Sequence, residues 1–313
     1  MPQIVITGGS GFIGSHVTRH AESLHLPLRL MSHRTRVPAT APGTETVPGD
    51  LRDPGSLRGL CEGAEVLIHC ASQIGGPPEL CEAVNARGTE ALMEEALRGG
   101  VSRIVYLSTV AVYGRGSYRR ARVADLARNP LSDTSRTRAA AEDAVLAAGG
   151  IVLRPHLVYG AEDTKVVPAL ARLLVNMPGS VEGWSRRTSA IAAEDLARVL
   201  VATALAPAGR LTESVYHANH PEPVLWSDLL RAVSTALSLP RPDTDLTAQE
   251  ARDFLATRGI SSHDLDMLTS DHWFDSSLIW TDADCAPGPG FTHRFPRHAA
   301  WYRDSLAAGP VSV

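Results

Sequence analysis

The stretch Thr7-Gly8-Gly9-Ser10-Gly11-Phe12-Ile13-Gly14 decides the fold. It follows the apolar run Ile4-Val5-Ile6 and opens a helical pattern over residues 12–24. Glycines at this spacing let the backbone turn tightly after a strand and approach a pyrophosphate, whose charge then faces the free N–H groups of the helix. We therefore predict a dinucleotide-binding turn, to which the following residues contribute: Gly8, Ser10, Gly11, Phe12, Ile13 and Gly14.

Short β-rich runs alternate with helical patterns along the chain. Strands are predicted over residues 4–6, 28–32, 45–47, 65–70, 103–107 and 151–154, and helices over 12–24, 78–97, 130–148, 166–176, 193–206, 226–237 and 248–258. Such alternation implies right-handed crossovers and a parallel sheet covered on both faces. The sequence predicts an α/β, Rossmann-type doubly wound parallel sheet. Residues 1–160 would form the dinucleotide-binding domain, and residues 161–313 mainly a smaller C-terminal substrate-binding region, with some segments returning to the Rossmann core.

Composition excludes several classes of protein. Thirty basic residues against thirty-four acidic ones, in 313 residues, leave a net charge of −4 without a block of like charge, which argues against nucleic-acid and membrane-surface partners. The four cysteines form no CxxC pair, which in a chain of this length argues against a disulfide framework. No apolar run approaches the ~18–20 residues that span a bilayer. His217 and His220 lack a third ligand at zinc spacing, so no metal is predicted. We expect a soluble cytoplasmic protein without a signal peptide.

Six further motifs spread over most of the chain. They are Gly49-Asp50-Leu51-Arg52-Asp53, His69-Cys70-Ala71-Ser72, Asn85-Ala86-Arg87-Gly88-Thr89, the run from Tyr106 to Gly114, the run from Leu153 to Gly160, and Ala193-Glu194-Asp195-Leu196-Ala197. With the glycine turn, they make the chain resemble the extended short-chain dehydrogenase/reductases, which include nucleotide-sugar epimerases, dehydratases and ketone reductases. The resemblance implies that Asp50 and Leu51 contact adenine. It also implies that Ala71 and Ser72 lie along the pyrophosphate and ribose, and that Pro155, His156 and Leu157 border the nicotinamide.

The end of the second predicted strand indicates which dinucleotide is bound. NAD-binding relatives place an acidic residue there, whereas NADP binders use arginine near it. In this chain the position falls on Ser32, and no carboxylate occurs between Leu24 and Glu45. A 2′-phosphate would find a cationic partner in Arg34, helped by His33 or Arg36. The sequence therefore predicts NADPH as the cofactor.

The usual proton donor of the family is missing. The resemblance places Thr134 where relatives carry a tyrosine, and Arg138 where they carry a lysine four residues later. The single lysine, Lys165, follows Ala161 by four residues, so no Tyr-x-x-x-Lys motif exists in the chain. Threonine cannot act as a general acid near pH 7, although Arg138 can still donate hydrogen bonds to the ribose. Thr109 matches the family's hydroxyl that hydrogen-bonds the reacting carbonyl.

Four explanations for the missing motif stay open at this point. A reductase could take its proton from another side chain, namely His156, Tyr113 or Tyr118. The substrate could supply the proton from a phenol beside its carbonyl. The protein could be a non-catalytic cofactor sensor, or catalyse a reaction that needs no tyrosine. We take Thr109, His156 and Tyr113 as the candidate catalytic residues, His156 because its ordinary pKa lies near neutrality.

The segment after the sixth predicted strand bears on the substrate. Nucleotide-sugar relatives carry an asparagine three residues after the arginine that corresponds to Arg154, and this chain has Leu157 there. The Arg154-Pro155 pair resembles instead the branch that reduces apolar, ring-bearing ketones, and the whole pattern resembles the tailoring ketoreductases of aromatic polyketide antibiotics. The expected partner is a small-molecule aromatic ketone, angucyclinone-like in shape. The alternatives are a non-catalytic NADP-sensing regulatory protein and a sugar-nucleotide epimerase/dehydratase relative.

Overall fold

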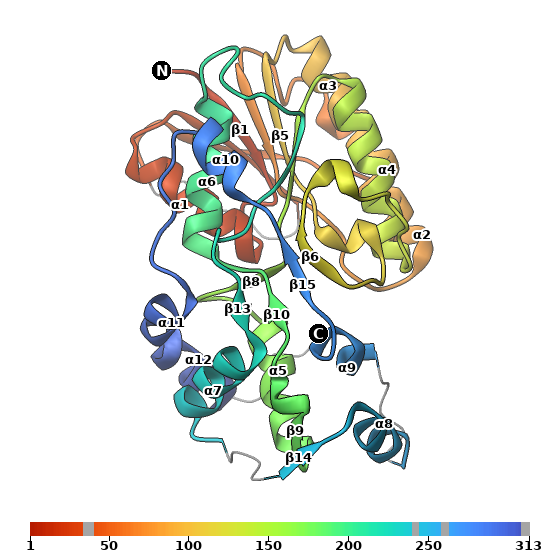
Figure 1. Ribbon diagram of the computed structural model, residues 1–313. Coiled ribbons are helices and arrows are strands. Elements are labelled where there is room, and N and C mark those ends of the chain that lie inside the picture. The colour runs from red at the N-terminus through yellow and green to blue at the C-terminus, as the bar shows by residue number, and fades with distance from the viewer. Residues whose placement is uncertain (34–40, 240–243, 258–262, 308–313) are drawn as a thin grey trace.

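A seven-stranded parallel sheet forms the centre of the upper part of the molecule (Figure 1), in a computed structural model that describes residues 1–33, 41–239, 244–257 and 263–307. The strand order is β12-β7-β5-β4-β1-β2-β3. The bounds are β1 Ile4–Thr7, β2 Leu28–Ser32, β3 Thr44–Pro48, β4 Val66–His69, β5 Arg103–Leu107, β7 Ile151–Arg154 and β12 Val215–His217. This confirms the predicted doubly wound sheet. The strand order reverses between β1 and β4, and such a reversal opens a crevice at the carboxyl ends of the strands.

Helices cover both faces of this sheet. On one face α1 (Phe12–Ser23) packs beside α6 (Ala193–Leu205), and on the other α3 (Gly88–Arg98) packs beside α4 (Asp133–Ala147). Alternate residues of β1 divide between the two layers, since Ile4 and Ile6 belong to the first core and Val5 to the second. Strands buried on both faces are continuous apolar runs, which is why the sequence identified them.

The helix predicted over residues 78–97 is interrupted. It consists of α2 (Pro78–Cys81), a π-helical stretch Glu82–Arg87, and α3. π-Helical turns often occur at functional sites because they redirect one side chain within a helix. Here the stretch carries Asn85, whose buried amide reaches the loop after β4.

A second, smaller sheet lies below the first, with the order β13-β10-β15-β6. Its strands have two to four residues: β6 Tyr118–Ala121, β10 Arg187–Thr188, β13 Val224–Leu225 and β15 His272–Phe274. Two strand pairs complete the β-structure: β8 (Leu157–Tyr159) with β11 (Ala190–Ala192), and β9 (Gly179–Val181) with β14 (Thr244–Leu246). The sequence missed this sheet, because such short strands carry no measurable periodicity.

Helices of the second half build a separate apolar core. They are α5 Val166–Asn176, α7 Trp226–Leu237, α8 Ala248–Thr257, α9 His263–Leu268, α11 Phe291–Arg294 and α12 Ala299–Ala307. Helix α10 (Ser277–Asp282) instead packs Ile279 and Trp280 into the core of the large sheet. Trp184, Trp226 and Tyr302 are buried in this core. Single 3₁₀ turns occur at Pro54–Leu57, Val110–Tyr113, Val123–Asp125, Glu182–Trp184 and Phe295–His298. Within the described ranges, no helix is long and apolar enough to cross a membrane.

Segments of the second half also return to the first sheet. Strand β12 pairs with β7, α6 packs on α1, and α10 contacts α6. In the other direction, β6 leaves the first half and pairs with β15, more than 150 residues later in the sequence. The two sheets are therefore linked through strands that cross between them.

Candidate active site

The glycine turn between β1 and α1 can be made only by glycines. Gly8 has φ +75°, and a Cβ there would lie 2.5 Å from the backbone nitrogen of Ala71. A Cβ on Gly14 would overlap the carbonyl oxygen of Gly8, which already accepts the N–H of Gly11 at 2.9 Å. The turn is thus pressed against the end of β4, and the first N–H groups of α1 face the crevice.

A cavity of about 280 Å³ lies at the carboxyl ends of β1, β2 and β4. Its lining includes eight residues of the predicted cofactor site: Gly8, Ser10, Gly11, His33, Asp50, Leu51, Ala71 and Ser72. Phe12, Ile13 and Gly14 form the first turn of α1 behind it. Arg34 and Arg36 fall outside the described residues.

Arg52 is a lining residue that the sequence analysis did not single out, although it lies in the quoted Gly49–Asp53 motif. The Asp50 carboxylate accepts hydrogen bonds from Arg52 Nε (3.0 Å) and Nη2 (2.6 Å), and it lies 3.0 Å from His33 Nε2. The hydrogen bonds from Arg52 lower the pKa of Asp50 to about 2. Asp50 is therefore charged and fixed in place near neutral pH.

The loop after β4 is held by one buried amide. Asn85 Oδ1 accepts from Ser72 Oγ (3.1 Å) and from the Gln73 backbone N–H (2.7 Å). Its Nδ2 donates to the Gln73 carbonyl (2.9 Å) and to Thr137 Oγ1 (3.0 Å) on α4. Because every polar atom of this side chain is engaged, Ser72 has a fixed position at the cavity wall.

The two positions of the missing motif have other partners. Thr134 Oγ1 accepts the Gly75 backbone N–H at 3.0 Å and thereby joins α4 to the loop after β4. Arg138 is buried with its Nη2 donating to the carbonyl of Leu107, and its guanidinium lies 5.9 Å from the ring centroid of Tyr106. The Nε of Arg138 is buried without a hydrogen-bond partner in the described part of the chain.

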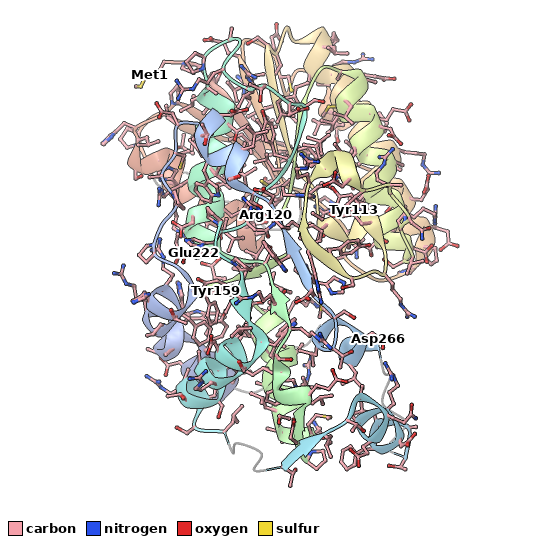
Figure 2. All side chains as sticks on the ribbon, viewed as in Figure 1. Met1, Tyr113, Arg120, Tyr159, Glu222 and Asp266 are labelled. Atoms are coloured by element: carbon pink, nitrogen blue, oxygen red, sulfur yellow. The ribbon has the colours of Figure 1, made fainter. Side chains whose placement is uncertain are left out.

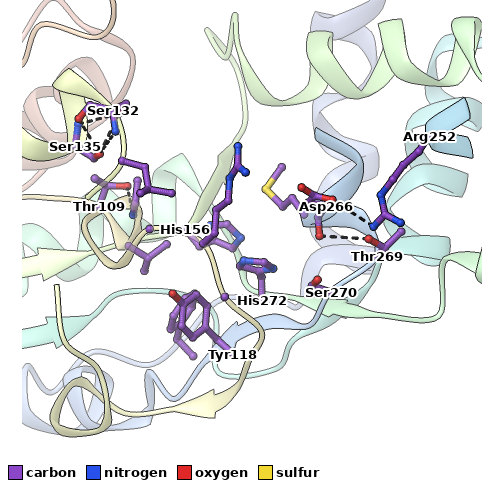
Figure 3. A pocket seen from close by; sticks show the side chains of 18 residues that line it. Thr109, Tyr118, Ser132, Ser135, His156, Arg252, Asp266, Thr269, Ser270 and His272 are labelled. Carbon is purple, nitrogen blue, oxygen red and sulfur yellow. Dashed lines mark hydrogen bonds and ion pairs between the residues drawn. The ribbon is translucent and has the colours of Figure 1, made fainter. Parts of the chain in front are cut away.

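A larger cavity, of about 750 Å³, lies between the end of β5, the start of α4 and the second sheet (Figure 3). Thr109 lies on its wall, at the residue that caps the turn Val110–Tyr113. The Thr109 hydroxyl oxygen accepts the Ala111 N–H at 3.1 Å, which leaves its own O–H proton free to donate into the cavity. Donation by a hydroxyl is strengthened when that hydroxyl also accepts a hydrogen bond.

His156 also lines this cavity, and its backbone N–H donates to Asn219 Oδ1 at 2.7 Å. Burial, together with the neighbouring His272, lowers the pKa of His156 to about 3. The ring is therefore neutral near pH 7, so it can form hydrogen bonds but carries no readily released acidic proton. This property weakens the case for His156 as the general acid.

Tyr113, labelled in Figure 2, is buried and is not among the residues that line this cavity, which weakens its case as an acid. Its hydroxyl accepts from Arg154 Nη1 at 2.7 Å and contacts His217 Nε2 at 2.7 Å. Burial raises the pKa of Tyr113 above its ordinary value. The ring of Tyr118 does line the cavity, but its hydroxyl donates to the Tyr113 carbonyl and burial likewise raises its pKa.

A buried ion pair explains why Tyr113 is held this way. Glu142 is completely buried and accepts from Arg154 Nε (2.8 Å), Arg154 Nη2 (2.5 Å) and Ser108 Oγ (2.5 Å). The third guanidinium nitrogen of Arg154, Nη1, donates to the Tyr113 hydroxyl. A buried charge pair tolerates few unsatisfied donors, so Tyr113 completes this network.

Pro155 and Leu157 take part in the packing beside the cavity, and their contact with the nicotinamide stays a prediction. Leu157 opens β8 and is buried in the apolar core of the second half, because side chains alternate along a strand and His156 takes the cavity side. The Pro155 carbonyl accepts the Val110 N–H at 3.0 Å. Met267 and Phe274 line the cavity, whereas the large apolar side chains of Met177, Trp184 and Trp226 are buried in the core of the second half.

No group of three or more His, Cys, Asp or Glu side chains that could hold a metal ion occurs among the residues described. The site instead combines a glycine turn on a doubly wound sheet with a hydroxyl-bearing cavity beside it. This combination defines a Rossmann-fold protein of the oxidoreductase type. The model of the NAD dependent epimerase/dehydratase family matches residues 4–217, and the chain belongs to this family.

Relatives with assigned activities include several reductases. The chain is 28% identical over 273 residues to a 2-alkyl-3-oxoalkanoate reductase of Stenotrophomonas maltophilia, with 80% of each chain covered. It is 29% identical over 176 residues to the 4-hydroxy-2-methyl-3-oxo-4-farnesyl-3,4-dihydroquinoline-1-oxide ketoreductase of Stigmatella aurantiaca, with 53% of each covered. Among solved structures, the Bordetella bronchiseptica enzyme WbmH in complex with NAD+ matches with a TM-score of 0.74 at 20% identity, covering 97% of this chain and 99% of that one. At that identity, the likeness concerns the fold.

Proposed function

We propose that this protein is an NADPH-dependent ketoreductase that acts on an aromatic polyketide-type ketone. In its finer form, the proposal is an angucyclinone-like ketone of the kind reduced in simocyclinone biosynthesis. The observation that carries it is the Thr109 hydroxyl, which lies in a cavity of about 750 Å³ bordered by the rings of Tyr118, His156, His272 and Phe274. A wall of flat rings suits a flat, polycyclic substrate. The ring-bearing ketone in the name of one relative agrees with this substrate class.

The residues present fit a nicotinamide dinucleotide. A side chain on Gly8 or Gly14 would collide with backbone, so the turn keeps the close approach that a pyrophosphate needs. Asp50 and Leu51 would border the adenine, Ser72 would lie along the pyrophosphate and ribose, and the unpartnered Nε of Arg138 would be available to donate to a ribose hydroxyl. When bound, the cofactor supplies a hydride.

The choice of NADPH over NADH rests on the end of β2. Ser32 ends this strand without a carboxylate to receive a ribose 2′-hydroxyl, and His33 follows it on the cavity wall. Arg52 adds a guanidinium to the same wall, although Asp50 balances its charge. Arg34 and Arg36 stay predictions for the 2′-phosphate.

The proposed role of Thr109 is to stabilise the developing charge on the carbonyl oxygen. Its free O–H proton would donate to that oxygen as it becomes an alkoxide. An alkoxide is a strong base, so a proton must reach it as it forms. A phenol on the substrate, beside the carbonyl, would give this proton intramolecularly, and solvent would reprotonate the weaker phenolate afterwards. This route requires neither Tyr118 nor His156 to release a proton.

The first test is whether purified protein oxidises NADPH when given 8-hydroxy-1-tetralone, in which a phenol lies beside the carbonyl. Consumption of NADPH with formation of the secondary alcohol is expected. Because the Tyr-x-x-x-Lys motif is absent, a non-catalytic NADP sensor is the competing function. Tight NADPH binding without oxidation by this ketone or larger hydroxylated polycyclic ketones would favour the sensor.

A further inference from the structure

Two imidazole rings lie against one another on the wall of the larger cavity. The ring centroids of His156 and His272 are 5.9 Å apart, and their planes differ by 30°. His156 comes between β7 and β8 in the first half of the chain, whereas His272 opens β15 near its end. Figure 3 shows His156 between Thr109 and His272. The pair is therefore assembled only where the two parts of the molecule meet.

Each ring has a buried nitrogen that the described residues leave without a hydrogen-bond partner: Nε2 of His156 and Nδ1 of His272. Buried polar atoms in folded proteins are nearly always paired, and an unpaired one destabilises the fold. Phe274 packs edge-on against His156, with centroids 5.8 Å apart, and Tyr118 edge-on against His272, 5.3 Å apart. These contacts hold both rings in place on the cavity wall, where each imidazole keeps an unused capacity for hydrogen bonding.

The chemistry of the rings indicates what they bind. Burial lowers the pKa of both histidines, so each ring is neutral near pH 7 and has one N–H donor and one bare acceptor nitrogen. A hydroxyl group both donates and accepts, and therefore satisfies either tautomer of either ring. A carbonyl or an ether oxygen only accepts. A charged group would lose its water shell beside two neutral rings.

We propose that His156 and His272 bind a hydroxyl group of the substrate other than the one beside the reacting carbonyl, and thereby select hydroxylated aromatic ketones. Both rings line the same cavity with their centroids 5.9 Å apart, so one hydroxyl placed beside them could interact with both imidazoles. The hydroxyl would orient the substrate on the ring wall with its carbonyl toward Thr109. This inference rests on the proposed function, because it concerns the substrate of the same cavity.

The experiment measures binding rather than turnover. Isothermal titration calorimetry of the NADP+-loaded protein compares 1-tetralone with 5-, 6- and 7-hydroxy-1-tetralone. At least one hydroxylated ketone is expected to bind on the order of tenfold more tightly than 1-tetralone, as a well-made hydrogen bond in a buried site provides. In His156→Phe and in His272→Phe, which keep a ring on the wall, this ratio is expected to fall toward one.

Two further variants separate recognition from folding. His272→Asn retains a donor and an acceptor, and should keep part of the preference. Tyr118→Phe removes a hydroxyl from the same wall but neither nitrogen, and should leave the ratio unchanged. The inference is overturned if no hydroxylated tetralone binds more tightly than 1-tetralone, or if the preference survives in both phenylalanine variants. A preference that depends on the histidines, without oxidation of NADPH by any ketone, would support this site and refute the proposed reductase.

Discussion

The glycine turn and the larger cavity are built in opposite ways. The turn belongs to one short stretch, residues 7–14, and its shape follows from glycines that no other residue can replace. The cavity is assembled from β5, α4, β6 and β15, and its polar groups come from residues as distant as Thr109 and His272. The glycine turn is therefore encoded by one local stretch of sequence. The larger cavity depends on packing between segments that lie far apart in the chain.

The buried ion pair behind the cavity should give the largest effect on stability. Glu142→Ala leaves Arg154 buried and unpaired, so the free energy of unfolding should fall by about 3–5 kcal/mol. The matched control is Arg122→Ala, which removes an exposed pair with Asp125 and should cost less than about 1 kcal/mol. Urea unfolding followed by circular dichroism measures both. Equal losses in the two variants would show that the buried Glu142–Arg154 pair contributes no more to stability than an exposed ion pair.

The glycine turn should show the largest effect on cofactor binding. Gly14→Ala puts a Cβ onto the carbonyl of Gly8, and the turn must open to relieve the overlap. NADPH affinity, measured by the quenching of protein fluorescence, should fall on the order of a hundredfold, which corresponds to about 2.7 kcal/mol. Glu94→Ala, an exposed change on α3, serves as the control. Unchanged affinity in Gly14→Ala would contradict the assignment of the turn.

Removing the hydroxyl of Thr109 should slow the reaction without weakening NADPH binding at the glycine turn. Thr109→Val keeps the side-chain shape but loses the donor to the carbonyl oxygen. The fall in kcat/KM should correspond to a loss of about 1.5–4 kcal/mol of transition-state stabilisation. Thr134→Val, at the position of the missing tyrosine, should change kcat/KM little, because that hydroxyl contacts Gly75 rather than the cavity. If kcat/KM fell in Thr134→Val and stayed unchanged in Thr109→Val, Thr109 would not be the group that contacts the carbonyl.

The dependence of the rate on pH should be the smallest effect. The pKa of His156 is lowered to about 3, so this ring loses its proton well below neutrality. Burial raises the pKa of Tyr118, so its hydroxyl stays protonated up to a pH above the ordinary tyrosine pKa near 10. Neither group changes charge between pH 6 and 9, and kcat for a fixed substrate should be flat there after correction for titration of the substrate. A titration in that window that disappears in Tyr118→Phe or His156→Phe would identify a protein acid.

The same division explains what could be predicted from sequence. Six strands of the large sheet, the turn and most helix bounds followed from short apolar runs and from glycine spacing. Strand β12 and the second sheet did not, because two- to four-residue strands depend on partners such as the β6–β15 pairing. His272 was missed for this reason. The burial of Tyr113 and its bond to Arg154, which weaken its case as a proton donor, cannot be deduced from its position in the chain.

The central claim is that reduction proceeds with a proton from the substrate, and one comparison of two ketones tests it directly. The wild-type protein is given 8-hydroxy-1-tetralone and 8-methoxy-1-tetralone, with NADPH oxidation and binding to the NADP+-loaded protein measured for each. Both ketones are expected to bind within a few-fold of one another, while the methyl ether is reduced at least about a hundredfold more slowly, since it loses the intramolecular proton transfer. Reduction of the ether at the normal rate, together with loss of activity in Tyr118→Phe or His156→Phe, would show that the proton comes from the protein.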